Sequence, residues 1–264
     1  MKDEVLIKDE QKVVVENDDK MSSENIEESD DCDKFEKMVL SQLFKLQDMS
    51  YRDYTSVLVP NIDKSTIVGV QVPILCKFGK DILRDSNNVM GISPFLNKLP
   101  HKYYEENILH AYFIVNLCNF DELIFELDKF LPYVNNWAIC DFIRPKISEY
   151  YLPMFIEKIK QWLQSSDTYT IRFGIEMLMK HYLGRNLKKE YLLLVVDIKS
   201  KEYYVKMMAA WYFATALATH YESVAPLLKQ RKLDEWTQNK TIQKARDSKK
   251  IPPERKAELK TYMV

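Results

Sequence analysis

Glycine is unusually scarce in this chain. Only five glycines occur among 264 residues, whereas average usage of roughly 7% would supply more than three times as many. Strand-and-turn architectures and phosphate-cradling loops both depend on glycine. Neither a GxGxxG nor a GxxxxGK[ST] motif is present. The composition therefore disfavours β-rich folds and the common nucleotide-binding folds.

Residues that bind metals or form disulfides are also few and scattered. The cysteines and histidines are Cys32, Cys76, Cys118, Cys140, His101, His110, His181 and His220. No CxxC pair and no metal-ligand spacing is found among them. We therefore expect no metal and no cofactor. Together with the lack of a signal peptide, this pattern predicts reduced thiols in the cytoplasm.

Long apolar runs are missing as well, because charged residues interrupt every apolar stretch before it reaches the roughly 20 residues that cross a bilayer. We therefore expect a soluble protein that does not enter a membrane.

The formal net charge of −1 averages two very different regions. Residues 1–33 contain 13 acidic residues and four lysines, a net charge of −9, which predicts an acidic disordered tail. Residues 34–264 contain 34 basic and 26 acidic residues, a net charge of +8. A basic body suits a polyanionic partner, although an ordinary solvated basic surface is at least as common.

From Phe35 onward, apolar residues recur at helical spacing. The clearest runs predict helices over residues 151–163, 171–182 and 210–221. Short breaks separate the runs at Pro100, Asn119, Pro132 to Asn136, Ser165 to Asp167, Gly184 to Asn186, and Ser200. Helix pairs of roughly 35 to 45 residues are typical of HEAT repeats. We therefore predict one all-α domain over residues 34–264, a right-handed stack of antiparallel helix pairs (a HEAT-like-repeat solenoid).

Proline and glycine positions refine these boundaries. The stretch Gly69–Pro73 is interpreted as a loop that ends with proline in the first turn of a helix. The same interpretation applies to Pro94, Pro145, Pro252 and Pro253. Gly174 lies inside a predicted helix, where close helix packing would explain a residue that costs about 1 kcal/mol relative to alanine.

Three segments place aromatic side chains beside charged ones. Trp137 and Asp141 are four residues apart, so a helix would present them on one face. Arg172 falls beside the apolar stripe of its helix, and Trp211 lies at the edge of another stripe. Taken singly, a tryptophan on a helix is usually a core residue, and such an arginine usually pairs with a nearby carboxylate.

Together these residues resemble the AlkD-type HEAT-like-repeat family of alkylpurine DNA glycosylases, and the likeness spans about residues 35–250. The loop Gly69–Pro73 is similar to that family's Gly-x-x-x-Pro entry into an early helix. By this resemblance, Trp137 and Trp211 flank the sugar of the damaged nucleotide. Asp141 stabilises the cationic sugar that forms as the base leaves, and Arg172 holds a nearby phosphate.

The resemblance implies a DNA repair enzyme that hydrolyses the N-glycosidic bond of cationic N3- or N7-alkylated purines in duplex DNA. The lesion would be handled in a basic channel without being flipped into a pocket, unlike most base-excising enzymes. Further DNA contacts are expected from Arg52, Lys206, Lys240, Lys244 and Arg246. The stretch 234–246, which contains the last three, reads equally well as a solvated C-terminal helix. The sequence does not select one alkylated base.

Two other interpretations stay open. Members of the family that excise bases probe the minor groove with a short helix, and the matching stretch here, Tyr51–Asp63, contains Pro60 and a single arginine. This departure favours a non-catalytic relative that binds DNA weakly. A protein-binding helical solenoid is the third interpretation. For all three we expect a monomer in the cytoplasm, associated with the nucleoid if the source is bacterial.

Overall fold

The computed structural model describes residues 34–264, and within this range the chain is all-helical, with no β-strand. The predicted disorder of residues 1–33 lies outside the described residues. Among the helices described, none combines the length and apolar character that a bilayer crossing requires. The chain divides into two compact units, and the all-α fold class is confirmed in both.

The first unit comprises residues 34–55 and 65–110 of the described chain. Its helices are a helix over residues 34–45, α2 (Met49–Leu58), η1 (Lys64–Thr66), α3 (Val72–Arg84), α4 (Ser86–Val89), α5 (Ile92–Asn97) and α6 (Tyr104–Leu117). The helices α2 and α6 each continue into the second unit. The stretch 51–63 therefore does carry a helix, and Pro60 lies beyond its end.

The predicted loop Gly69–Pro73 is organised around the buried carboxylate of Glu105. This carboxylate accepts hydrogen bonds from the backbone amides of Val68 (2.9 Å), Gly69 (2.7 Å) and Val70 (3.2 Å). Gly69 has φ +98°, and a Cβ there would lie 2.5 Å from the carbonyl oxygen of Asp48. Only glycine fits this conformation without strain. Pro73 then occupies the first turn of α3, as predicted.

The second unit comprises residues 56–64 and 111–264. Its helices are α7 (Phe120–Phe130), η2 (Leu131–Tyr133), α8 (Trp137–Phe142), η3 (Glu149–Tyr151), α9 (Leu152–Trp162), α10 (Thr168–Tyr182), α11 (Lys189–Val196), α12 (Tyr203–Thr219), α13 (Tyr221–Lys229), α14 (Glu235–Asp247) and α15 (Pro253–Lys260).

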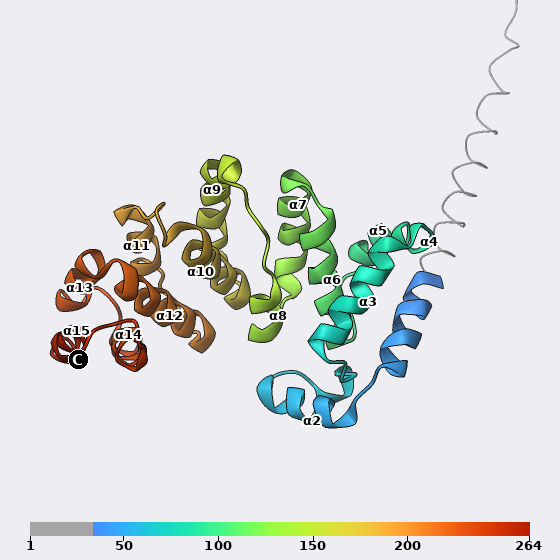
Figure 1. Cartoon of the computed structure of the whole chain (residues 1–264), viewed down its shortest axis with the longest axis horizontal. Helices are drawn as coiled ribbons and strands as arrows, with labels where there is room; N and C mark the ends of the chain where they lie inside the picture. The colour runs from blue at the N-terminus through green and yellow to red at the C-terminus, as the bar shows by residue number, and fades with distance from the viewer. Residues whose placement is uncertain (1–33) are drawn as a thin grey trace, which may run out of the picture. The chain divides into compact units, whose positions relative to one another are not determined.

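These helices stack in two rows, as Figure 1 shows for this unit. In one row α8 packs on α10, α10 on α12, and α12 on α14. The helices α9 and α11 lie against α10, α13 lies against α12, and α15 lies against α14. The core between the rows contains Phe155, Phe173 and Phe213, which are fully buried. This is the helical-repeat stacking that the apolar periodicity predicts.

Most of the predicted boundaries are confirmed, with two corrections. The run 210–221 is not one helix, because His220 leaves the helical region (φ −134°, ψ 46°) and Tyr221 begins α13. Pro145 does not begin a helix and lies buried in the segment between α8 and η3. Gly174 is explained by packing, since a Cβ there would lie 3.0 Å from the Leu163 side chain. Among the described cysteines, Cys76, Cys118 and Cys140 are free, as expected.

Candidate functional site

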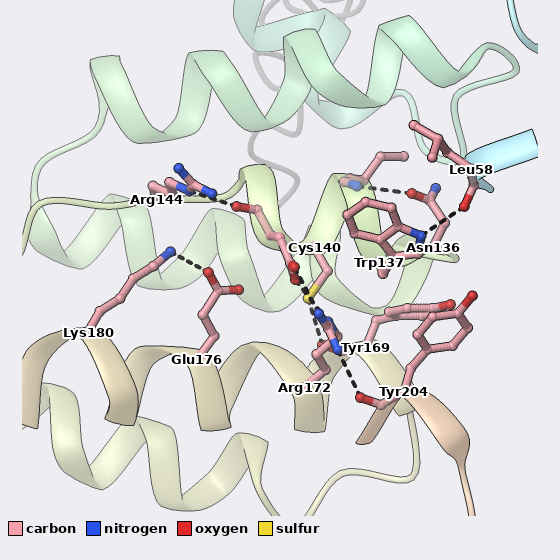
Figure 2. Close-up of polar contacts among 12 residues, drawn as sticks. Leu58, Asn136, Trp137, Cys140, Arg144, Tyr169, Arg172, Glu176, Lys180 and Tyr204 are labelled. Atoms are coloured by element: carbon pink, nitrogen blue, oxygen red, sulfur yellow. Dashed lines mark hydrogen bonds and ion pairs between the residues drawn. The ribbon is translucent and has the colours of Figure 1, made fainter. Parts of the chain in front are cut away.

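The short helix α8 carries two of the predicted site residues. The side chain of Asn136 caps its N-terminus by accepting a hydrogen bond from the amide of Ile139 (3.0 Å). Trp137 and Asp141 follow on the same face, one turn apart, as the sequence predicts. The indole N–H of Trp137 donates to the carbonyl of Leu58 at 3.0 Å. The ring of Trp137 is therefore fixed by the last residue of α2 (Figure 2).

A buried ion pair holds Asp141. Arg172 on α10 donates from Nε and Nη2 to the two carboxylate oxygens of Asp141, each at 2.8 Å. The side chains of Arg172 and Asp141 are only 5% and 13% exposed. The remaining guanidinium nitrogen, Nη1, donates to the carbonyl of Tyr204 on α12 at 2.9 Å. One guanidinium therefore joins three successive helices of the row, and it orients the carboxylate through a two-point contact.

This arrangement shows a role of Arg172 within the protein that the sequence did not predict. A direct phosphate contact needs an accessible cation, but this side chain is buried and its three nitrogens donate within the protein. Burial works against its charge, yet the hydrogen bonds and charge of Asp141 outweigh burial and raise the pKa of Arg172. In this structure Arg172 orients Asp141, and its contact with phosphate stays a prediction.

A second buried carboxylate lies beside the pair. Glu176 is 1% exposed, and its Oε1 receives an ion pair from Lys180 at 2.5 Å. Burial, reinforced by the charge of Asp141, raises the pKa of Glu176. The pair of Lys180 with Glu176 lies one to two turns further along α10 than Arg172 (Figure 2).

Three potential ligand atoms, from Cys140, Asp141 and Glu176, lie within 4.8 Å of one another. The donor set suits a metal poorly. Cys140 is fully buried, and burial raises the pKa of its thiol well above the ordinary value, which opposes the thiolate that a metal needs. Arg172 already holds both oxygens of Asp141. We assign no cation to these residues.

The fourth predicted site residue, Trp211, is 41% exposed on α12. It lies seven residues after Tyr204, two helical turns further along, and so on the same face of α12. The helix α12 packs against α10, which carries Arg172. All four residues that carry the resemblance therefore belong to consecutive helices of one row.

Comparison with known protein families identifies the chain. Residues 41–245 match the family model described as DNA alkylation repair enzyme, which covers most of the chain. The chain belongs to the DNA alkylation repair enzyme family. Membership carries a role in the repair of alkylated DNA. No curated protein and no solved structure matches the chain.

The matched region of this DNA alkylation repair protein includes two exposed cations that sequence reasoning missed. Arg144 donates from Nε to the backbone carbonyl of Asp141 at 2.8 Å, and its exposed guanidinium lies at the edge of the site. Lys180 is exposed and lies two turns after Arg172 on α10. Sequence spacing could have found both residues, since Arg144 follows Asp141 by three positions and Lys180 follows Arg172 by eight.

Some of the predicted DNA contacts on α12 and α14 have a partner within the protein, and some do not. Lys206 is paired with Asp234 at 2.9 Å, whereas Arg246 has no hydrogen-bond or ion-pair partner within residues 34–264. Lys240 donates to Gln243 at 2.9 Å.

Lys244 is the predicted DNA contact whose pKa is shifted by its surroundings. Burial, with the charges of Lys240 and Arg172, lowers the pKa of Lys244. Arg52 lies on the part of α2 that belongs to the first unit, so its DNA contact stays a prediction.

Proposed function

We propose that the protein is an alkylpurine DNA glycosylase, which excises cationic N3- and N7-alkylated purines from duplex DNA. The observation that carries this proposal is the carboxylate of Asp141, partly exposed and held at two points by Arg172. The indole of Trp137 lies one turn away on the same helix. A carboxylate and an aromatic face are the groups that a cationic sugar requires.

The reaction needs little from the protein beyond electrostatics. The bond between C1′ and the purine nitrogen breaks with its electron pair left on the nitrogen, so the cationic base departs neutral. The positive charge passes to the sugar, where Asp141 and the tryptophan faces stabilise it. Water then adds to C1′ and loses a proton, which leaves an abasic site. An alkylated purine that is already positive needs no acid to protonate it.

Cations around the site would hold the DNA backbone. Arg144 on the segment after α8, Lys180 on α10 and Lys244 on α14 join Arg172 as candidates for phosphate contacts near the lesion. Such contacts are salt-dependent, because each one releases counterions from the duplex.

A non-catalytic DNA-binding relative is the second candidate function. The observation that favours it is the complete pairing of Asp141 with Arg172, which leaves the pair with no net charge to offer a cationic sugar. In this alternative the ion pair serves the fold, and the exposed cations bind DNA without excision.

One assay separates the two functions. A duplex oligonucleotide that contains a single N7-methylguanine is incubated with the protein, released base is measured by chromatography, and abasic sites are measured by alkaline strand cleavage. We expect release by the wild-type protein and loss of release in Asp141→Asn. Asp197→Asn is the matched control, because Asp197 is an exposed carboxylate at the end of α11.

The outcomes are distinct. No release by the wild-type protein, with salt-sensitive duplex binding retained, contradicts the glycosylase and supports the non-catalytic relative. Release that persists in Asp141→Asn contradicts the role of the carboxylate. If neither release nor binding is found, the third interpretation, a protein-binding solenoid, replaces both.

A further inference from the structure

An open groove lies beside the start of α12, over the exposed face of α14. Its volume is about 710 Å³, and the residues that define its chemistry are Lys206, Trp236, Lys240, Gln243, Arg246 and Met263. The helices α12 and α14 pack directly on each other within the second unit, so the groove belongs to one compact body (Figure 1).

Trp236 is the aromatic residue that lines this groove, and the ring of Tyr203 lies beside it. Trp236 and Tyr203 are 36% and 55% exposed, and their ring centroids are 5.6 Å apart at an interplanar angle of 66°. The amino group of Lys206 lies 5.3 Å from the centroid of Trp236, which makes the ring part of a cationic environment. The indole N–H of Trp236 has no hydrogen-bond partner in the described part of the chain. Exposed aromatic rings beside cations are the usual platform for unpaired bases.

The charged part of the groove continues along α14. A second groove shares Gln243 and Arg246 with the first and adds Lys256 and Lys260 from α15. The two grooves together contain five cations and three carboxylates. One of these carboxylates, Asp234, is already engaged by Lys206 and by the amide of Thr237. Along α14 the cations Lys240 and Arg246 are six residues apart, about 9 Å at a rise of 1.5 Å per residue.

This surface is separate from the site around Asp141. Lys244 and Arg246 are two residues apart on α14, so they project from opposite sides of its exposed face. The residues that line the groove include Arg246 but not Lys244. Trp236 lines the groove as well. A ligand in the groove therefore does not need to contact Asp141 or Arg172.

We propose that this groove binds unpaired nucleotides of a DNA strand. A base stacks on Trp236 and Tyr203, and the adjoining phosphates contact Lys240 and Arg246. The combination of stacking and cations predicts binding that depends on the presence of bases and decreases with salt. A purely electrostatic surface would depend on salt alone. The proposal goes beyond the glycosylase activity and does not require it.

The test compares two fluorescent single strands of about ten nucleotides, a length within the range that single-strand-binding domains occupy. One is oligothymidylate, and the other has the same phosphates but only abasic sugars. Anisotropy is measured with the full chain. We expect the wild-type protein to bind oligothymidylate about tenfold more tightly than the abasic strand, from the stacking of a single base.

Variants test whether Trp236 causes the difference in affinity between the two strands. Trp236→Ala should abolish the preference for bases, and Trp236→Phe, which keeps a ring, should retain part of it. Phe125→Ala is the matched control, because Phe125 on α7 is 61% exposed and also has a lysine, Lys129, 5.1 Å from its ring centroid. This control should bind both strands like the wild-type protein. Thermal unfolding of each variant establishes that it is folded.

Equal affinity of the wild-type protein for the two strands overturns the proposal, as does an unchanged preference in folded Trp236→Ala. Base release from methylated duplex is measured in the same variants and should be unaffected by Trp236→Ala. A wild-type protein that prefers bases but releases none would contradict only the glycosylase activity, whereas release without the preference would contradict only the groove.

Discussion

Replacing Arg172 with methionine should destabilise the protein strongly. The substitution leaves the carboxylate of Asp141 without its cation at a position where only 13% of the side chain is exposed. Breaking a buried ion pair by removing one partner costs about 3–5 kcal/mol. The carbonyl of Tyr204 also loses its donor, a loss of about 1 kcal/mol that overlaps with the first. We expect the free energy of unfolding to fall by about 3–5 kcal/mol in total.

The double variant Arg172→Met with Asp141→Leu tests the reason for this loss. Replacing both members of a buried pair with apolar residues of similar volume is often neutral. The double variant should therefore recover most of the stability that Arg172→Met loses, although it lacks the carboxylate. Recovery would show that the cost arises from the uncompensated charge and not from a changed packing volume.

The measurement is urea unfolding of the three proteins, followed by circular dichroism. Thermal midpoints provide a second measurement, and at about 2–4 °C per kcal/mol for a chain of this size the single variant should lose roughly 6–20 °C. A loss below about 1 kcal/mol in the single variant, or a double variant less stable than the single one, would refute the buried pair as the element that holds Asp141. Arg172→Lys, which keeps the charge but not the two-point contact, should lower base release more than stability.

Three further predictions concern other residues. Because burial raises the pKa of Glu176, the folded state favours its protonated form, so the free energy of unfolding should fall as pH rises above about 4.3. Urea midpoints measured from about pH 5 to 8 should therefore vary less with pH in Glu176→Gln than in the wild-type protein. An equal dependence on pH in the two proteins would contradict the raised pKa. Gly69→Ala should lower the free energy of unfolding by about 1–3 kcal/mol, because Gly69 has a positive φ and a Cβ there would lie close to the carbonyl oxygen of Asp48. Gly184→Ala is the control, and it should leave the urea midpoint nearly unchanged because a Cβ there meets nothing within 4 Å. Trp137→Phe removes the hydrogen bond to Leu58, so it should lower the free energy of urea unfolding by about 0.5–1.5 kcal/mol and slow base release. If neither the free energy of unfolding nor the rate of base release changes, the hydrogen bond does not fix the ring.

The helices were predictable because their signal is local. Apolar residues at i, i+3 and i+4 fix the buried face of α9 and α10 directly. The end of α12 was not predictable in this way, because Tyr221 continues the apolar spacing while His220 leaves the helix to reach the carbonyl of Leu183 at 2.6 Å. That contact is between residues 37 positions apart, and no window along the sequence contains it.

In the site too, features set by local spacing were predictable, whereas contacts between residues far apart in the sequence were not. The shared face of Trp137 and Asp141 follows from their spacing within one helix. The partner of Asp141 does not, because Arg172 lies 31 residues away and its burial depends on how α8, α10 and α12 pack. The sequence predicts that Arg172 lies beside the stripe, and the resemblance assigns it to phosphate, but neither reveals the two-point contact with Asp141 that the structure shows.

Helical-repeat proteins ordinarily gain and lose repeats readily, because each repeat contacts only its neighbours. In this chain a single side chain on α10 reaches both the preceding helix of the row and the following one. Inserting or deleting a helix pair between α8 and α12 would separate Arg172 from Asp141 or from Tyr204. The contacts of Arg172 therefore set the number of helices in the middle of this stack, whereas helices at its ends carry no such constraint from this residue.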